Sequence, residues 1–401
     1  MVPARGALPA AAEHLGGPAA RSRLRCGVVR RWAHSASAAT PPGGNSTFYA
    51  PIKRLELARG TVSGPGGRHS RSGLQVCVLG ATGFLGGFVT SEIARSGSNI
   101  VVATQGDDMG WRHLKPCADY GKLVAAYMHL KDEGSVRAAI KGADVVVNLM
   151  GRHYETKHYF PTLINCSFED VHVRGAELVA RLAREEDVKH LVHVSSTQAS
   201  ASSASRWARS KHAGESAVLS QFPGAVIVRP NVCYADEDRY LTRMANMCSL
   251  LPFFPLVEGG TARQSPVYVG DVGKAVAAIA RDFGTAGQTF NLSGEHAYTT
   301  KEVAEYVMQQ TQHGKPLVDV PLGAARLAGR RINNLPNPYL NEDQVLLQLE
   351  DAPGVRVGEL GLKDLGFTKI SDFEQTAYNF LFRFRSGGHF IDKKSDRAQH
   401  N

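Results

Sequence analysis

From residue 73 onward, short apolar runs alternate with segments in which apolar residues recur every three to four positions. The apolar runs predict buried strands at Leu74–Leu79, Asn99–Thr104, Lys122–Met128, Ala143–Leu149, His190–Ser195 and Ala225–Pro230. Segments of helical spacing lie between them, at Phe84–Ser96, Ser135–Lys141 and Val171–Glu186. Strands of continuous Val, Ile and Leu that alternate with helices indicate an α/β protein with a doubly wound parallel sheet, covered on both faces.

The pattern becomes less regular after about residue 232. Leu250–Val257 is apolar but broken by prolines, which predicts a loop or a short element. Ser265–Ala280 predicts a strand that runs into a helix, and Gln288–Leu292 with Thr300–Gln310 predicts a second such pair. Late insertions of this kind usually form a small lobe over the carboxyl ends of the strands, where ligands bind in doubly wound sheets.

The charge of the chain is concentrated at its N-terminus. The 401 residues have a formal net charge of +9, and all of it lies in residues 1–72, which contain 11 Lys/Arg and 2 acids. Residues 73–401 contain 35 Lys/Arg and 35 Asp/Glu, so their net charge is zero. A neutral body lacks the concentrated basic surface that nucleic-acid binding requires, so we expect no nucleic-acid partner. No stretch approaches 18 consecutive apolar residues, and we expect no transmembrane helix.

Residues 1–38 have the composition of a mitochondrial transit peptide. They contain six arginines and one acid, with many Ala, Ser and Gly and no long apolar core of a secretory signal. A plastid signal and a disordered basic tail are the alternatives. Residues 39–72 are rich in glycine and basic residues and predict an extended arm. The six cysteines are scattered without a C-x-x-C pair, which fits a reducing compartment such as the matrix.

The strongest motif is a glycine-rich turn after the first predicted strand. The run from Gly80 through Ala81, Thr82, Gly83, Phe84 and Leu85 to Gly86 places G-x-x-G-x-x-G between a buried strand and an amphipathic helix. Glycines there allow a tight turn, a close approach to a pyrophosphate, and close helix–strand packing. The helix N-terminus presents N–H groups to phosphates. We therefore expect a Rossmann-type nucleotide-binding core at residues 73–235, which residues 236–401 complete while forming a smaller C-terminal lobe and tail.

The end of the second predicted strand bears on which dinucleotide is bound. An NAD site usually has an acid there for the ribose hydroxyls, but this strand ends at Thr104 and Gln105. The missing acid favours NADP, whose 2′-phosphate Arg112 or Lys115 would hold. Asp107 and Asp108 are alternative ribose partners, which keeps NAD open.

Fold and glycine motif together resemble the extended and atypical short-chain dehydrogenase/reductases, from about residue 74 to residue 310. That resemblance predicts a catalytic Tyr-x-x-x-Lys pair, but the sequence reads Trp207-Ala208-Arg209-Ser210-Lys211. An indole N–H only donates and cannot act as an acid near neutral pH. Lys211 can still hold a ribose, so we expect nucleotide binding with no catalytic residue and no metal. Tyr154, Tyr159 and Tyr234 are the alternative sources of a phenol.

Further segments are more specific: Asn148–Lys157, Phe168–Val171, Ser205–Glu215 and Gln264–Val269. With them the chain resembles the NADPH-binding accessory subunits of mitochondrial respiratory complex I. The resemblance implies a non-catalytic subunit on the matrix side of the inner membrane, which binds NADP(H) and stabilises the junction of the peripheral and membrane arms through other complex I subunits. It assigns the remaining cofactor-binding positions to Thr104, Arg112, Leu149, Gly151, Ser195, Lys211 and Pro230.

Two other interpretations stay open at this stage. One is an NAD(P)-dependent reductase or epimerase of the extended short-chain dehydrogenase class, and the other is an RNA-associated relative of the same fold. The C-terminal stretch 363–401 mixes Phe380, Leu381, Phe382, Phe384 and Phe390 with Arg and Lys. It fits peripheral contact with a membrane or partner, and equally a helix packed on the protein's own body.

Overall fold

A computed structural model describes residue 67 and residues 69–157, 164–333, 338, 340–352, 354–355 and 358–385. The predicted transit peptide, almost all of the basic arm, residues 158–163 and the chain after residue 385 lie outside the described residues, so the predictions made for these segments stay predictions.

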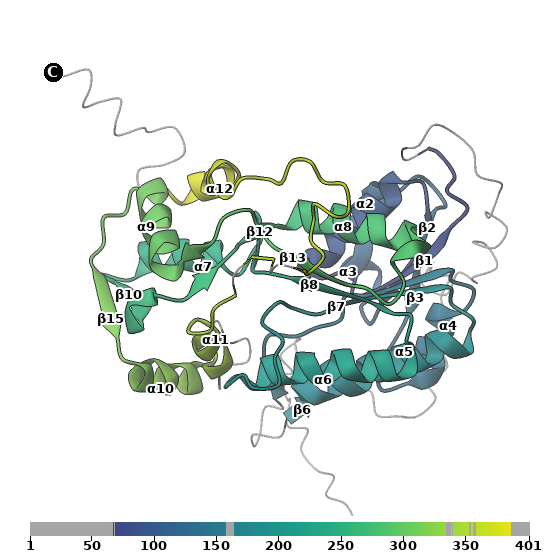
Figure 1. The fold of residues 1–401 in the computed structure, drawn as a ribbon, viewed down its shortest axis with the longest axis horizontal. Helices are drawn as coiled ribbons and strands as arrows, with labels where there is room; N and C mark the ends of the chain where they lie inside the picture. Colours follow the sequence, from purple (N-terminus) through teal and green to yellow (C-terminus); the bar gives the residue numbers. More distant parts are fainter. Residues whose placement is uncertain are drawn as a thin grey trace, which may run out of the picture. The chain divides into compact units, whose positions relative to one another are not determined.

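A seven-stranded parallel sheet forms the centre of the fold (Figure 1). In spatial order the strands are β13 (Thr289–Leu292), β8 (Val226–Pro230), β7 (His190–Val194), β4 (Val145–Asn148), β1 (Gln75–Leu79), β2 (Asn99–Thr104) and β3 (Leu123–Tyr127). The strand order reverses at β1, which pairs with β2 on one side and β4 on the other. Ligands bind at such a switch point, outside the carboxyl ends of the strands.

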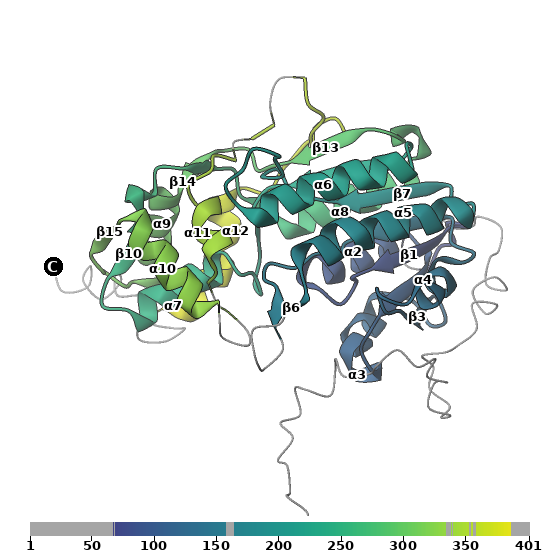
Figure 2. The ribbon, with the colours of Figure 1, turned by 90° about the horizontal axis from the view of Figure 1, so that it is seen from below.

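Helices cover both faces of this sheet (Figure 2). One face carries α2 (Phe84–Arg95), α3 (Asp108–Trp111) and α8 (Val269–Arg281), and the other carries α4 (Glu133–Ile140), α5 (Gly175–Glu185) and α6 (Arg206–Gln221). Successive strand residues point to opposite faces, so Val76 and Val78 join the first core while Cys77 and Leu79 join the second. The prediction of a doubly wound α/β fold is confirmed.

The later segments form a smaller lobe with its own core. Its helices are α7 (Leu241–Leu250), α9 (Thr300–Thr311), α10 (Leu322–Ile332), α11 (Glu342–Leu347) and α12 (Phe373–Leu381). Its short strands pair as β10 (Phe254–Val257) with β15 (Leu317–Val320), β11 (Arg263–Gln264) with β14 (Tyr298–Thr299), and β12 (Val267–Tyr268) with β9 (Cys233–Tyr234). A further pair, β5 (Thr156–Lys157) and β6 (Ile164–Cys166), follows β4.

The described part of the C-terminal stretch packs on the protein's own body. Phe373, Ala377 and Leu381 of α12 are at most 4% exposed and belong to the core of the smaller lobe. Of the two interpretations of this stretch, the packed helix holds for residues 373–381, and contact with a membrane remains a prediction for residues beyond 385. Among the described residues, no helix combines the length and apolar character that crossing a membrane requires.

Candidate functional site: the carboxyl ends of the central strands

The glycine-rich turn follows β1 and lies against the loop that follows β4. Gly80 has φ of +82°, a conformation that side chains rarely adopt. A Cβ on Gly80 would lie 3.1 Å from the Leu149 carbonyl carbon, so the two loops touch through their backbones. The predicted positions Gly80 and Leu149 are thus brought together at the switch point of the sheet.

The same turn leads into α2, and the backbone N–H groups at the start of this helix are available as hydrogen-bond donors. Thr82 and Gly83 are exposed, and Gly83 occupies the N-cap of α2 without any side-chain cap. The first N–H groups of the helix, those of Phe84, Leu85 and Gly86, have no partner within a helix. A Cβ on Gly86 would lie 2.4 Å from the carbonyl oxygens of Gly80 and Ala81, so only glycine lets the helix pack this closely. This geometry suits a pyrophosphate.

Local contacts occupy the polar groups at the end of β2. The Thr104 hydroxyl accepts from the Gly106 N–H at 3.1 Å. Asp107 caps α3 by accepting from the Gly110 N–H at 3.3 Å, and Asp108 accepts from the Trp111 indole at 3.2 Å. The carboxylates of Asp107 and Asp108, the alternative ribose partners, therefore make hydrogen bonds within the α3 turn.

Arg112, which we predicted to bind the cofactor, is exposed at the end of the α3 turn. Its guanidinium donates to the Met109 thioether at 3.8 Å. It makes no hydrogen bond to the glycine turn among the described residues, so nothing in the structure fixes it at the site. Lys115, the other candidate, lies with its ammonium 4.4 Å from the centre of the Trp111 ring.

Lys211 reaches from α6 to the end of β4. The residue is only 7% exposed, and its ammonium donates to the Val194 carbonyl at 3.4 Å. A Cβ on Gly151 would lie 3.1 Å from Lys211 Nζ, so Gly151 makes room for the ammonium. Burial lowers the pKa of Lys211 to about 8, although Glu215 opposes the shift. Because the ammonium has one long hydrogen bond among the described residues, it has donors left for a ligand.

Two buried hydroxyls follow the strand whose last carbonyl, that of Val194, binds Lys211. The Ser195 and Thr197 hydroxyl oxygens, just beyond β7, have no hydrogen bond within the described chain. Pro230 ends the neighbouring strand β8, and its carbonyl accepts from the Thr197 N–H at 3.1 Å. Buried polar groups are normally satisfied, so these two hydroxyls are available to a polar ligand. Ser195, Lys211 and Gly151 thus fit the second half of a dinucleotide whose pyrophosphate the glycine turn would hold.

Trp207 occupies the position where the resemblance predicts a catalytic tyrosine. Its indole N–H donates to the Arg152 carbonyl at 2.8 Å, and its ring stacks on His153 at 5.9 Å between centroids. His172 completes the contact, since its Nε2 accepts from the Arg152 N–H at 3.1 Å while Nδ1 meets the Ser210 hydroxyl at 2.8 Å. The indole thus ties the start of α6 to the loop after β4 and offers no proton to a ligand.

Neither of the two alternative tyrosines that the structure describes, Tyr154 and Tyr234, is placed to replace the missing phenol. Tyr234 is fully buried and meets the Phe373 ring edge to face in the core of the smaller lobe, where burial raises its pKa. Tyr154 packs under the Arg239 guanidinium at 5.7 Å. Tyr159 lies outside the described residues. The described chain also holds no group of three or more His, Cys, Asp or Glu that could bind a metal.

Sequence reasoning missed Asn148, which shapes the turn after β4. Its side-chain oxygen accepts from the Met150 N–H at 3.0 Å, and its amide nitrogen lies 3.2 Å from His193 Nδ1. His193 is 2% exposed, and burial lowers its pKa to about 3. A buried Asn at the end of an apolar strand was the available signal, because a buried amide needs partners.

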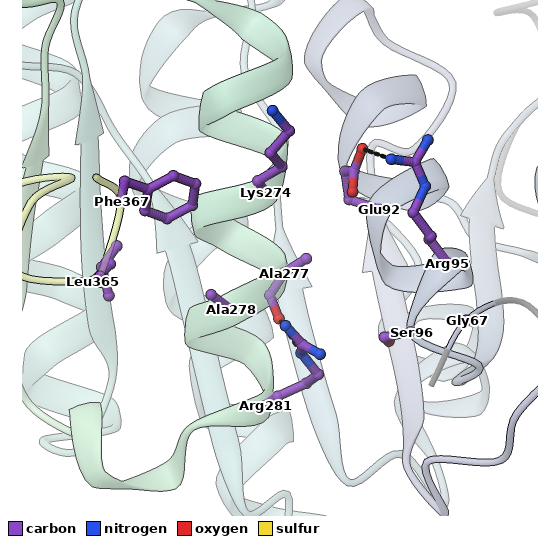
Figure 3. A pocket seen from close by; sticks show the side chains of 11 residues that line it. Gly67, Glu92, Arg95, Ser96, Lys274, Ala277, Ala278, Arg281, Leu365 and Phe367 are labelled. Carbon is purple, nitrogen blue, oxygen red and sulfur yellow. Dashed lines mark hydrogen bonds and ion pairs between the residues drawn. The ribbon is translucent and has the colours of Figure 1, made fainter. Parts of the chain in front are cut away.

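A surface pocket lies elsewhere, between α2 and α8 on the outer side of the helices (Figure 3). Its volume is about 360 Å³. Arg95 and Glu92, paired at 3.2 Å, face Lys274 and Arg281 across it, with Phe367 and Leu365 at one end. No residue predicted to bind the cofactor lines this pocket, so it is separate from the site at the strand ends.

Comparison with known proteins adds family information to this geometry. The model of the NAD dependent epimerase/dehydratase family matches residues 76–293. The "NADH dehydrogenase [ubiquinone] 1 alpha subcomplex subunit 9, mitochondrial" of Arabidopsis thaliana is 36% identical over 338 residues, which cover 81% of each chain.

Solved structures support the fold. A dTDP-glucose 4,6-dehydratase from Streptomyces venezuelae with NAD bound has a TM-score of 0.57 and 16% identity, over 78% of this chain and 96% of that one. A triphenylmethane reductase from Citrobacter sp. with NADP(H) also has a TM-score of 0.57, with 17% identity over 76% and 99%. The fold therefore occurs in proteins that bind either dinucleotide.

Proposed function

Because this chain belongs to the family of mitochondrial NADH dehydrogenase [ubiquinone] 1 alpha subcomplex subunit 9 proteins, we propose that it is a non-catalytic accessory subunit of respiratory complex I. In this proposal it lies on the matrix side of the inner membrane, holds NADP(H) as a structural ligand, and stabilises the junction between the peripheral and membrane arms. Its partners are other subunits of the complex.

One observation carries the non-catalytic part of this proposal. Trp207 stands four residues before Lys211, and its indole N–H is already engaged by the Arg152 carbonyl at 2.8 Å. Proton transfer to a substrate needs a titratable group within hydrogen-bond reach, and an indole does not titrate near neutral pH. The groups that would hold a dinucleotide are nevertheless present, namely the glycine turn, the Lys211 ammonium and the Ser195 hydroxyl.

The bound nucleotide would span the switch point of the sheet. The backbone N–H groups of Phe84 and Leu85 would hold the pyrophosphate, with Gly83 at the N-cap and Thr82 beside them, and with Gly86 giving room. Lys211 and Ser195 would hold the nicotinamide-side ribose, next to the backbone at Leu149, Gly151 and Pro230. A ligand that binds the folded state at 1,000 times its dissociation constant stabilises it by about 4 kcal/mol. Such a ligand would stabilise the fold by contacting the segments that follow β1, β4 and β7 at the same time.

We favour NADP over NAD at this site. Gln105 follows β2, where an NAD site usually presents an acid, and Asp107 and Asp108 are engaged within the α3 turn. Arg112 and Lys115 supply positive charge nearby, and the exposed Arg112 would have to swing onto the 2′-phosphate. Removing both charges should then weaken NADP binding and leave NAD binding unchanged.

Two measurements on the native protein test the proposal. The chain should co-migrate with a large membrane complex on native gels, and a pool of free matrix protein would contradict the assigned role. The purified chain should not oxidise NADPH in the presence of sugar-nucleotide or carbonyl substrates. Steady turnover that Lys211→Ala abolishes would establish the alternative, a reductase or epimerase of the extended short-chain dehydrogenase class.

A further inference from the structure

Residues 341–350, which include α11, reach across to the start of α6 from far along the chain. The Asp343 carboxylate oxygen Oδ1 accepts from the Ser205 hydroxyl at 3.0 Å, the Arg206 N–H at 2.7 Å and the Trp207 N–H at 3.4 Å. The short helix α11 lies near the N-terminal end of α6 (Figure 1). One carboxylate thus gathers three donors at the beginning of the helix that carries Trp207 and Lys211.

Asp343 supplies a cap that α6 lacks in its own sequence. Ser205 occupies the N-cap, but its side chain makes no capping hydrogen bond. Helix N-termini leave N–H groups unsatisfied and favour negative charge. A carboxylate from another segment meets both needs, so the first turn of α6 depends on residues 341–350 staying in place.

The same segment holds two further loops around the nicotinamide side of the site. The Glu350 carboxylate accepts from the Ser203 hydroxyl at 2.6 Å and the Ala204 N–H at 3.1 Å, which fixes the loop between β7 and α6. The Asn341 amide donates to the His153 carbonyl at 2.5 Å, in the loop after β4. These two loops and the first turn of α6 surround the groups that would hold the nucleotide.

Apolar packing links the segment directly to Trp207. Leu347 packs against the cluster of Phe168, Trp207 and Ala208, and its carbonyl accepts from the Gln198 amide at 3.0 Å. Lys211 follows Trp207 by four residues, about one helical turn. Displacing residues 341–350 would therefore loosen Trp207 and Lys211 together.

We propose that residues 341–350 form a latch over the nucleotide site, and that Asp343 is a positioning residue which slows the release of the bound dinucleotide. The latch rests on the proposed function, because it presupposes that the chain holds a nucleotide. Asp343 acts through the first turn of α6 and need not touch the ligand.

The test compares three variants of the full chain, purified with its nucleotide. Asp343→Ala removes the trans-cap, and Asp343→Asn keeps an acceptor oxygen but loses the charge. Asp319→Ala is the matched control, because Asp319 also accepts from a backbone N–H in the smaller lobe, that of Gly259 at 2.7 Å, but does not contact α6. The readout is the rate at which bound NADPH fluorescence disappears when excess NADP⁺ is added.

Losing a helix cap should accelerate release roughly 5- to 30-fold in Asp343→Ala. Asp343→Asn should release at an intermediate rate, and Asp319→Ala at the wild-type rate. Wild-type release from Asp343→Ala, or equal acceleration by Asp319→Ala, would overturn the latch while leaving the proposed function intact. A wild-type chain that neither retains nor binds NADPH or NADH would overturn the proposed function and the latch with it. If Asp343→Ala fails to fold, the ratio of the Asp343→Asn rate to the wild-type rate decides.

Discussion

The substitution Gly83→Asp should abolish nucleotide binding while leaving the folding stability of the nucleotide-free protein almost unchanged. Gly83 has φ −80° and ψ 172°, which any residue can adopt, and a new Cβ would lie 3.4 Å from the Gly80 carbonyl oxygen, an ordinary contact. Aspartate is a favourable N-cap, better than glycine by only a few tenths of a kcal/mol. The nucleotide-free protein should therefore keep its free energy of unfolding to within about 0.5 kcal/mol.

The nucleotide-bound protein should behave differently. A carboxylate at the N-terminus of α2 takes the place of a phosphate and repels it, so the variant should lose the stabilisation of about 4 kcal/mol that a saturating ligand provides. Urea denaturation with and without added NADPH measures both quantities. Gly83→Asn is the matched control, since it has the same shape without the charge and should retain part of the ligand effect. If NADPH stabilises Gly83→Asp as much as the wild type, the assignment of the pyrophosphate to this turn is wrong.

Three further predictions use the same purified chain. Gly86→Ala should destabilise the protein by about 1–3 kcal/mol relative to Gly87→Ala, because a Cβ at Gly86 meets two carbonyls at 2.4 Å while one at Gly87 meets nothing within 4 Å; equal denaturation midpoints would refute this. Trp207→Phe should lower the free energy of unfolding by roughly 1–3 kcal/mol in denaturation experiments, because the hydrogen bond to the Arg152 carbonyl and part of the ring volume are lost. Burial lowers the pKa of His193, which is 2% exposed, to about 3, so the unfolded state takes up a proton first as pH falls. The free energy of unfolding should then drop by roughly 2 kcal/mol between pH 6.5 and 5, and His193→Gln should remove this part of the pH dependence in denaturation experiments.

The central sheet could be predicted from the sequence because strands buried on both faces appear as continuous runs of apolar residues. The strand expected at Asn99–Thr104 has those bounds in the structure, and the other central strands differ by one or two residues at their ends. The helix expected at Val171–Glu186 begins instead with a π-helical turn, Asp170–Arg174, before α5. That turn carries His172, whose ring binds the Arg152 N–H, a contact that apolar spacing does not encode.

The candidate site was predictable where one motif carries it, and hidden where distant residues meet. Glycine spacing identified the turn at residues 80–86, and the position of Lys211 followed from a short motif. The hydrogen bond between the Trp207 indole and the Arg152 carbonyl joins residues 55 positions apart in the sequence. The capping of α6 by Asp343 joins residues 136 to 138 positions apart. Such pairs depend on tertiary packing, and no periodicity in either segment reports them.

The most direct test of the account is mass spectrometry of the ligand released when the native, complex-bound protein is denatured. The account predicts one NADP(H) for each copy of this chain, retained through purification without added nucleotide. Absence of any dinucleotide from the intact assembly would contradict the claim that the site at the ends of β1, β4 and β7 holds a structural cofactor, and NAD(H) in its place would contradict the preference for NADP.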